Sequence, residues 1–144
     1  MALTDDKPLS LVHMLSNRIS RAFFDEVETQ YGISLAEWRV ILTLVSEPGV
    51  SGADITNRWA MEKMAVNRAV QRLVDAGHVA RTRDPDDRRS YRLALTAKGT
   101  KLYEKIAPTA NKRYAELSSA VSSDELAALV ATLRTMIARA EELN

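Results

Sequence analysis

Residues 51–99 read SGADITNRWAMEKMAVNRAVQRLVDAGHVARTRDPDDRRSYRLALTAKG and contain two consecutive helical patterns. Ser51 with Asp54 three positions later is a capping box, which begins a short helix of about two turns. Over residues 63–76 the apolar side chains recur at spacings of three and four, which predicts an amphipathic helix with a polar outer face. Gly77 favours a left-handed end to this helix.

After Gly77 the apolar period changes to two, which indicates β-strands. Two alternating segments, 79–83 and 90–95, are separated by Asp84-Pro-Asp-Asp and two arginines, a composition that favours a turn. The sequence therefore predicts a β-hairpin with a charged tip. Two helices joined by a tight turn and followed by such a hairpin are typical of a helix-turn-helix with a wing.

Long helices are predicted on both sides of this segment. Residues 9–31 show the spacing of one amphipathic helix, and a capping box at Ser34 begins a second, which Pro48 and Gly49 end. Thr96 is placed to cap a further helix in which Pro108 predicts a kink or a break, and the last helix begins at the capping box of Ser122 and Glu125. The fold class is mainly α with a small β-hairpin wing.

The composition bounds the architecture and excludes several classes of function. With 144 residues, 46% of them hydrophobic, the chain suffices for one domain with a hydrophobic core and is too short for a multidomain enzyme. The absence of cysteine excludes disulfides and thiolate metal sites within the chain. Acidic residues at positions 5 and 6 argue against a secretory signal, and the longest apolar runs are too short to cross a bilayer, so we expect a soluble, cytoplasmic protein.

Positive charge is concentrated in the middle of the chain. The whole chain carries +1, whereas residues 58–92 contain nine basic and five acidic residues, a net charge of +4 that leaves the rest at −3. This distribution is typical of a nucleic-acid-binding surface embedded in a scaffold, although surface arginines on a short hairpin would give the same count. The long amphipathic helices also present more apolar faces than a chain of this size buries, and a symmetric partner covers them most simply.

Four strings carry a resemblance to the MarR family of bacterial transcription regulators: VNRAVQRLVDAG at 66–77, VAR at 79–81, DPDDRR at 84–89 and LTAKG at 95–99. The order of the flanking helices matches too, so the resemblance covers essentially the whole chain. It implies one MarR-like domain over 1–144, in which a DNA-binding lobe at 34–99 lies between dimerisation helices at 1–33 and 100–144.

The function that the resemblance implies is that of a homodimer bound to double-stranded DNA at a palindromic operator. Its half-sites would lie about 34–36 Å apart. Such a regulator represses its own or neighbouring genes and is released by a small aromatic or phenolic ligand. It needs no cofactor and is not an enzyme.

Carried over position by position, the resemblance also implies roles for individual residues. Asn67 and Arg68 would lie near base edges, where Asn suits adenine and Arg suits guanine because each match is bidentate. Arg72 and Arg81 would clamp phosphates, and Arg89 would enter the minor groove. The full set of implied DNA contacts is Lys63, Met64, Ala65, Asn67, Arg68, Arg72, Arg81, Arg88 and Arg89.

Two acidic residues are candidates for orienting the wing arginines. Glu62 stands where the family more often has Asp, and Asp87 precedes Arg89 by two positions. A second departure is His78, where an apolar residue usually follows the glycine. Without the family strings, Arg88 and Arg89 would be interpreted as a solvated hairpin tip.

The remaining candidates concern ligands, metals and catalysis. His13, Arg21 and Trp38 are candidates for a ligand pocket, because Arg binds carboxylates and Trp stacks on rings, although core packing is the commoner role for Trp38 and for Trp59. The two histidines are 65 positions apart, so we expect no metal site. No serine has a plausible base beside it, and no phosphate-binding loop is present.

Two other functions stay open from the residues alone. A winged helix also serves as a protein-interaction module without specific DNA binding, although the +4 segment argues against this because interface centres are depleted of charge. A constitutive regulator without an effector is the other alternative. Retention on heparin and selection of bound DNA separate the first of these from a DNA-binding regulator.

Overall fold

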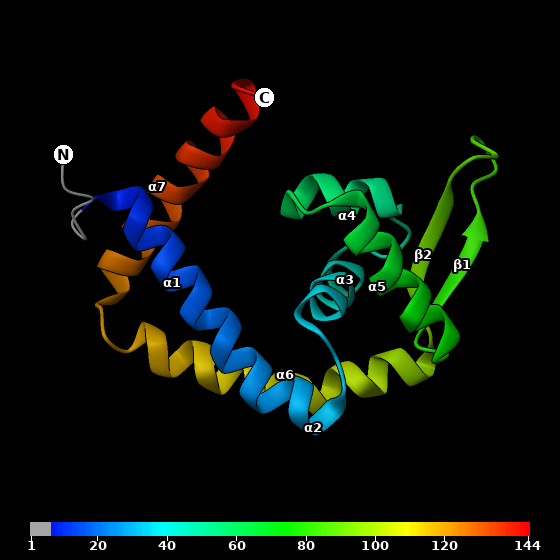
Figure 1. Cartoon of the computed structure of the whole chain (residues 1–144), viewed down its shortest axis with the longest axis horizontal. Helices are drawn as coiled ribbons and strands as arrows, with labels where there is room; N and C mark the ends of the chain where they lie inside the picture. The colour runs from blue at the N-terminus through cyan, green and yellow to red at the C-terminus, as the bar shows by residue number, and fades with distance from the viewer. Residues whose placement is uncertain (1–6) are drawn as a thin grey trace. The chain divides into compact units, whose positions relative to one another are not determined.

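A computed structural model describes residues 7–144, and its element order is the predicted one (Figure 1). The chain divides into two compact units, one ending at Thr109 and one comprising residues 110–144, which are described separately. The mainly α fold class with a two-stranded hairpin is confirmed. The elements are α1 (Pro8–Phe23), η1 (Phe24–Glu28), α2 (Thr29–Tyr31), α3 (Leu35–Ser46), α4 (Gly52–Trp59), α5 (Lys63–Asp75), β1 (Val79–Arg83), β2 (Tyr91–Leu95), α6 (Ala97–Ser118) and α7 (Ser123–Glu142).

The first predicted helix is not a single regular α-helix. Between α1 and α2 the chain forms a π-helical segment, η1, which a 3.6-residue spacing does not reveal. Among the side chains that the structure describes in this segment, those of Phe23 and Val27 are buried, while the rest of α1 is largely exposed. The Tyr31 hydroxyl donates a hydrogen bond to the backbone carbonyl of Lys105 at 3.4 Å, which ties α2 to α6.

Helix α3 lies at the centre of the first unit. Its N-cap is Ser34, whose hydroxyl accepts a hydrogen bond from the backbone N–H of Glu37 at 3.1 Å, which is one half of the predicted capping box. The reciprocal half does not form, because the Glu37 carboxylate accepts from the Ser34 hydroxyl at 3.0 Å and not from the Ser34 backbone N–H. The helix ends at Ser46, two residues before Pro48. It is buried on more than one side, and its buried residues are Glu37, Trp38, Val40, Ile41, Thr43 and Leu44.

Helices α4 and α5 form the helix-turn-helix. The Ser51–Asp54 capping box is present, with both reciprocal hydrogen bonds, and α4 buries Ile55. Helix α5 ends as the sequence predicts, because Gly77 has a φ of 81° and the His78 N–H bonds to the carbonyl of Leu73 at 2.8 Å. The inner face of α5 consists of Val66, Ala69, Val70 and Leu73.

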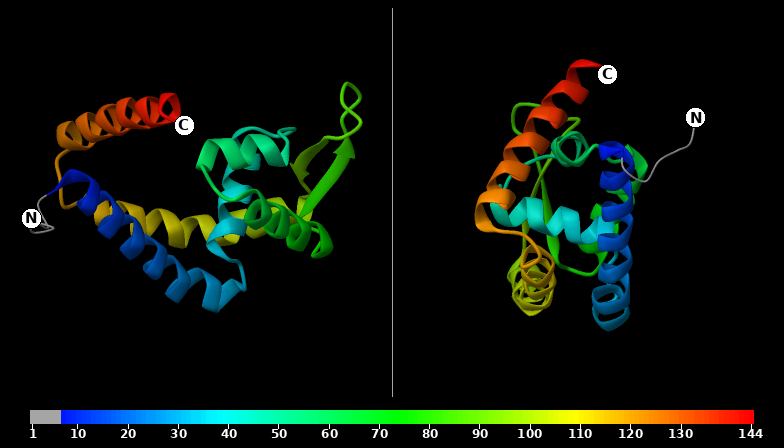
Figure 2. Two further views of the ribbon diagram at one scale, coloured as in Figure 1. Left: turned by 45° about the horizontal axis from the view of Figure 1, so that its top comes forward. Right: turned by 90° about the vertical axis from the view of Figure 1, so that its left-hand side faces the viewer.

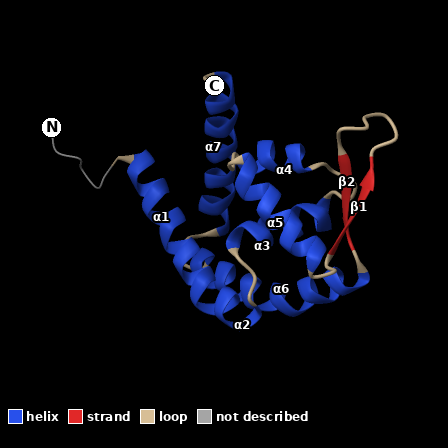
Figure 3. Ribbon diagram, turned by 45° about the vertical axis from the view of Figure 1, so that its right-hand side comes forward, coloured by secondary structure: helices blue, strands red, loops and turns tan. Residues whose placement is uncertain are grey.

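The wing is an antiparallel hairpin in which Val79 pairs with Leu95 and Arg83 with Tyr91 (Figure 3). Strand β2 begins at Tyr91, one residue later than predicted. Its outer edge is bonded to the segment before α4, since Leu93 donates to Val50 at 2.9 Å and accepts from Gly49 at 2.8 Å. The base of the hairpin is thereby fixed to the helical body, while its tip extends beyond the helices (Figure 2).

The base of the wing is closed by the first turn of α6. Thr96 caps this helix as predicted, since its hydroxyl accepts from the Gly99 N–H at 3.1 Å. The same residue reaches the end of α5: its N–H donates to the His78 carbonyl at 3.0 Å and its hydroxyl to the Gly77 carbonyl at 2.6 Å. Lys98 adds a bond from its ammonium to the carbonyl of residue 76 at 2.6 Å.

Gly99 is required by the same junction. A Cβ at this position would overlap the backbone carbonyl oxygen of His78, which cannot move aside without breaking its bond to Thr96. The Leu-Thr-x-x-Gly string therefore has a structural cause. It provides a helix cap and a close backbone approach in one turn.

Helix α6 continues without interruption through Pro108 to Ser118, so the break considered at this proline does not occur. Proline removes one backbone donor, and the hydrogen bonds of the surrounding turns suffice to continue the helix. In the second unit, α7 begins with the predicted capping box, in which Ser122 and Glu125 exchange hydrogen bonds of 3.1 and 3.2 Å. No residue of α7 is buried.

We expect the substitution Gly99→Ala to lower the free energy of unfolding by about 1–3 kcal/mol, because the added methyl group would displace the His78 carbonyl. Urea unfolding followed by circular dichroism measures this. Gly52→Ala is the matched control: it also lies in the first turn of a helix, and its nearest neighbour would be Asn67 Oδ1 at 3.9 Å, so we expect a change below about 1 kcal/mol. Equal midpoints for Gly99→Ala and the wild type would contradict the packing described.

Candidate nucleic-acid interface

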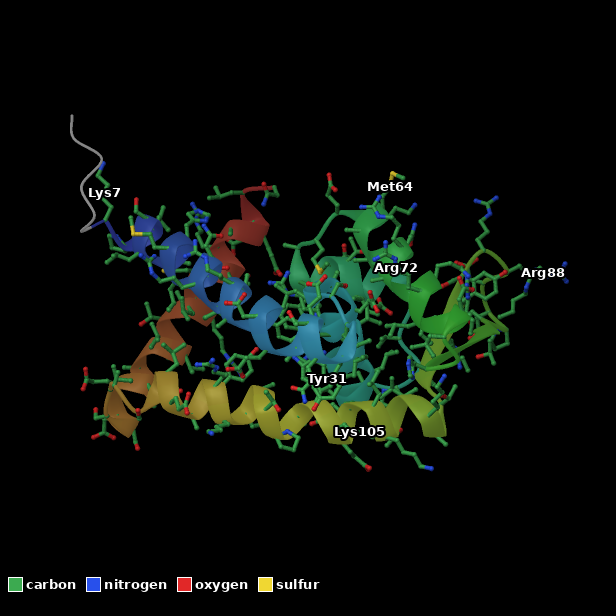
Figure 4. All side chains as sticks on the ribbon, turned by 60° about the horizontal axis from the view of Figure 1, so that its bottom comes forward. Lys7, Tyr31, Met64, Arg72, Arg88 and Lys105 are labelled. Carbon is green, nitrogen blue, oxygen red and sulfur yellow. The ribbon has the colours of Figure 1, made fainter. Side chains whose placement is uncertain are left out.

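The N-terminal half of α5 presents polar and cationic side chains to solvent. Lys63, Met64, Asn67 and Arg68 are all exposed, and Met64 has 67% of its surface accessible. Figure 4 shows Met64 at the outer end of α5, pointing away from the ribbon. Within residues 7–144, Lys63 and Arg68 have no hydrogen-bond or ion-pair partner. These two cations are therefore available to a ligand outside the chain.

Arg72, one turn further along α5, has a partner inside the protein. Its Nη1 atom lies 3.9 Å from Oε1 of Glu37 on α3, whose side chain is only 8% exposed. The same carboxylate oxygen accepts a hydrogen bond from the Ser34 hydroxyl at 3.0 Å. Arg72 itself is largely exposed, so Glu37 directs its guanidinium from beneath without enclosing it.

The buried carboxylate of Glu37 was not among the predicted site residues. Its position three after Ser34 was interpreted as part of a capping box, whereas in the structure its carboxylate accepts from the Ser34 hydroxyl and lies beside Arg72. A contact between α3 and α5 leaves no mark in the spacing of either helix. An apolar face that contains one acidic residue opposite an arginine is the only signal that points to it.

Arg81 connects the wing to the recognition helix. Its Nη2 atom donates to Gln71 Oε1 at 2.5 Å, and Gln71 in turn donates from Nε2 to Asp75 Oδ1 at 2.7 Å. The Arg81 guanidinium also lies 5.6 Å from the centre of the Tyr91 ring, with Arg83 at 5.7 Å. The predicted phosphate clamp thus has intramolecular partners, which fix β1 against the C-terminal half of α5.

The tip of the wing is ordered by short side-chain-to-backbone bonds. Asp87 Oδ1 accepts from the backbone N–H of Arg89 at 3.0 Å, and Asp84 Oδ1 accepts from that of Asp86 at 2.9 Å. Arg92 lies 3.5 Å from Asp84 and 3.8 Å from Asp86. The aspartates thereby shape the turn and neutralise Arg92.

The two arginines at the tip remain free. Arg88 and Arg89 are exposed, and no carboxylate in the part of the chain that the structure describes lies at ion-pair distance from either. Figure 4 shows Arg88 at the tip of the wing. Asp87 orients the backbone of Arg89 and does not contact its guanidinium. Glu62 is the N-cap residue of α5 but makes no side-chain capping bond, and the structure does not bring it to Arg89. Its pairing with Arg89 stays a prediction.

The candidate ligand residues are distributed over two environments. Trp38 is 1% exposed and packs between Tyr103, stacked at 5.8 Å, and Phe23 at 6.1 Å. Its indole N–H is buried and has no acceptor among the described residues. His13 and Arg21 are exposed on α1, and no hydrogen bond or ion pair in residues 7–144 joins either of them to Trp38.

Trp59 has a structural role in the helix-turn-helix. Its indole N–H donates to the Thr43 hydroxyl at 2.8 Å, and the guanidinium of Arg39 lies 5.4 Å from the ring centre. The packing interpretation of this residue agrees with these contacts. Among the described residues, no group of three or more metal-ligating side chains comes together, and no helix is long and apolar enough to span a bilayer.

Comparison with known proteins identifies this arrangement. A family model described as "MarR family" matches residues 31–90, which include the helix-turn-helix and most of the wing. An HTH-type transcriptional repressor of Mycobacterium tuberculosis is 30% identical over 102 residues, which cover 71% of this chain and 73% of the relative. The chain belongs to the MarR family. As a MarR-family regulator it is a DNA-binding protein of transcription control and not an enzyme.

Solved MarR-family structures show the same fold. A MarR/EmrR family transcriptional regulator from Acinetobacter sp. ADP1 has a TM-score of 0.83 at 26% identity, covering 95% of this chain and 99% of that one. BpsR from Bordetella bronchiseptica has a TM-score of 0.77 at 25% identity, covering 88% of this chain and 95% of that one. The DNA binding of BpsR is described as regulated by 6-hydroxynicotinic acid.

His78, which follows the glycine at the end of α5, has a shifted pKa. Its Nδ1 atom is buried and has no partner among the described residues. Burial lowers the pKa of His78 below the ordinary value of 6.5, and the positive charge of Lys98 lowers it further. A backbone hydrogen bond with Lys98 and the charge of Glu37 oppose this shift without cancelling it.

We expect this histidine to make stability depend on pH. Because the pKa is lower in the folded chain, the unfolded chain binds more protons as pH falls through about 6.5, so the contribution of neutral His78 is complete above that pH and is lost below it. The urea midpoint should fall from about pH 7.5 to about pH 5.5, and fall less in His78→Gln. His13→Gln, at the other histidine, should retain the wild-type dependence. Identical pH profiles for His78→Gln and the wild type would contradict the assignment.

Proposed function

We propose that this MarR-family protein is a homodimeric repressor of its own or neighbouring genes that binds a palindromic operator and is released by a small aromatic ligand. In this proposal the lobe at 34–99 contacts DNA, and the flanking segments 1–33 and 100–144 form the dimer. The observation that carries it is the apolar surface left uncovered on the terminal helices.

Helix α7 presents a continuous apolar face with nothing packed over it in the second unit. Its large apolar residues recur at helical spacing and are between 36% and 59% exposed: Leu126, Leu129, Val130, Met136 and Ile137. A monomeric soluble protein rarely exposes a contiguous apolar patch of this kind. A second copy of the chain can cover this face, because a two-fold symmetric dimer brings the same apolar face of both copies together.

Helix α1 has the same property in the first unit. Leu9, Leu11, Val12 and Leu15 are exposed, and Phe23 at its C-terminal end is its one buried residue. Each unit therefore carries an amphipathic helix whose apolar face has no cover within that unit. This supports an interface built from both termini.

The DNA-binding surface supports a two-part contact in each lobe. Free cations occur at two places, Lys63 and Arg68 on α5 and Arg88 and Arg89 at the wing tip. A helix of this kind enters the major groove, and a hairpin arginine fits the narrow minor groove beside it. Two lobes related by a dyad would then require half-sites about 34–36 Å apart.

Two observations support a ligand. BpsR, similar over most of this chain, responds to an aromatic hydroxy acid. In addition, the buried indole N–H of Trp38 has no acceptor among the residues that the structure describes. An unpaired buried donor costs about 1–3 kcal/mol in a folded protein, and a carboxylate or hydroxyl oxygen of a ligand would remove this cost. We therefore propose that Trp38 donates to the ligand and that Arg21 and His13 lie at the entrance of its site.

Charged substitutions on α7 test the dimer. We expect Leu129→Glu and Ile137→Glu to sediment as monomers at micromolar concentration, because each places a carboxylate in the apolar interface. Their affinity for a palindromic fragment selected by the wild type should fall by at least about tenfold, the equivalent of about 1.4 kcal/mol. Sedimentation velocity and fluorescence anisotropy provide the two readouts.

Thr135→Glu is the matched control, since residue 135 lies on the opposite side of α7 and bonds only to its own helix. This variant should remain dimeric and bind DNA normally. A wild type that sediments as a monomer and still binds the selected palindromic fragment would refute the dimer proposal.

The affinity of the wild type for this fragment should also fall steeply as the salt concentration rises. The slope of log affinity against log salt concentration changes by about 0.9 for each phosphate that the protein neutralises.

The ligand proposal is tested by thermal shifts with 6-hydroxynicotinic acid and related aromatic hydroxy acids. A ligand at about 100 times its Kd adds about 2.7 kcal/mol to stability. We expect this stabilisation to be reduced in Trp38→Phe, which keeps the aromatic packing and loses the N–H. Trp59→Phe, whose N–H already bonds to Thr43, should retain it. An equal shift in both variants would remove Trp38 from the site.

A further inference from the structure

Four exposed side chains of α5 form one row along its outward side, and the two halves of this row differ in their contacts. Met64, Arg68, Gln71 and Asp75 follow one another at spacings of four, three and four, so they lie along one line of the helix. In the C-terminal half, Gln71 accepts from Arg81 and donates to Asp75. These groups hold the wing against α5, so part of their hydrogen-bonding capacity is already in use.

The N-terminal half of the row is free. Arg68 has no partner in residues 7–144, and Met64 exposes 67% of its surface. Single exposed apolar residues are common, but this one stands among cations on the half-helix that is left to contact DNA. Its neighbours Lys63 and Asn67 on the same helix are polar and exposed.

Only one group on the base edges of the major groove is apolar, the 5-methyl group of thymine. A methionine side chain is unbranched, flexible and polarisable, so it can adjust its conformation to pack against a methyl group. Met64 and Arg68 are four residues apart, about 6 Å along the helix axis, which corresponds to one or two base-pair steps of about 3.4 Å. The arginine matches guanine through a bidentate contact.

We propose that Met64 is a specificity-determining residue that packs against the 5-methyl group of a thymine one or two steps from the guanine read by Arg68. This rests on the proposed placement of α5 in the major groove. The base preference of each half-site is thereby assigned to the first turn and a half of α5, while the remainder of the helix positions the wing.

Chemically altered operators test the proposal one atom group at a time. In a fragment selected by the wild type, each thymine of a half-site is replaced in turn by deoxyuridine, which lacks only the 5-methyl group, and each guanine by 7-deazaguanine, which lacks the N7 acceptor. Affinities are measured by fluorescence anisotropy at constant salt. We expect one deoxyuridine position to weaken wild-type binding about fourfold, the equivalent of the roughly 0.8 kcal/mol for one buried methyl-sized group, and to lie one or two steps from a sensitive guanine.

Variants assign these effects to residues. Met64→Ala should bind the thymine and deoxyuridine fragments equally and keep its sensitivity to 7-deazaguanine. Arg68→Ala should lose the guanine sensitivity instead, and Met64→Leu, which remains apolar, should still prefer thymine. Met61→Ala, three residues before Met64 and outside α5, is the matched control and should behave as the wild type.

The outcomes separate this proposal from the one it rests on. Failure of the wild type to select any DNA would refute the proposed function itself. Selection of an operator without a deoxyuridine-sensitive position beside the sensitive guanine would overturn the role of Met64 alone. An unchanged deoxyuridine penalty in Met64→Ala, with a circular dichroism spectrum like that of the wild type, would do the same.

Discussion

The close approach of residues 77–78 to the first turn of α6 is the constraint on which the DNA-binding lobe depends. The recognition helix ends here, β1 begins one residue later, and β2 ends one residue before Thr96. Thr96 bonds to the carbonyls of both Gly77 and His78, and Gly99 leaves the space that this contact needs. The end of α5, the base of the wing and the start of α6 are therefore one joint. Because the wing and α5 share it, their relative angle is fixed before either meets DNA.

A second layer of contacts divides the arginines of the lobe into held and free. Arg81 and Arg92 are engaged by Gln71 and by the wing aspartates, and Arg72 is directed by buried Glu37. The held arginines have already lost much of their side-chain freedom, so they stabilise the geometry of the lobe and contribute little new ordering cost on binding. Within the lobe at 34–99, every residue of which the structure describes, the cations without a partner are Lys63 and Arg68 on the N-terminal half of α5 and Arg88 and Arg89 at the tip of the wing. A chain with a net charge of only +1 can therefore still have a positive electrostatic potential concentrated at α5 and at the tip of the wing.

The sequence predicted those features that depend on local chemistry. The capping boxes at Ser51 and Ser122, the left-handed Gly77 and the alternating strands each have a cause within four or five residues, and each is present. The π-helical η1 was missed because one inserted turn does not disturb an amphipathic pattern enough to be seen. The break at Pro108 was considered because a proline removes a hydrogen bond, but the loss of one donor does not end a helix of this length.

Contacts between elements were beyond the reach of spacing arguments. Arg81 was assigned to phosphate from its place in the chain, yet its partner Gln71 lies ten residues earlier on another element. Glu37 and Arg72 meet across α3 and α5, and the spacing of apolar residues in either helix does not predict the pair. These contacts decide which cations remain available to DNA. The winged helix-turn-helix can therefore be predicted from the sequence, whereas the role of each individual arginine requires the structure. The same reasoning applies to Asp87, a candidate for orienting the wing arginines: its carboxylate accepts from the backbone N–H of Arg89, because the main chain is the nearest donor within the turn, and the guanidinium of Arg89 is left free for an external partner.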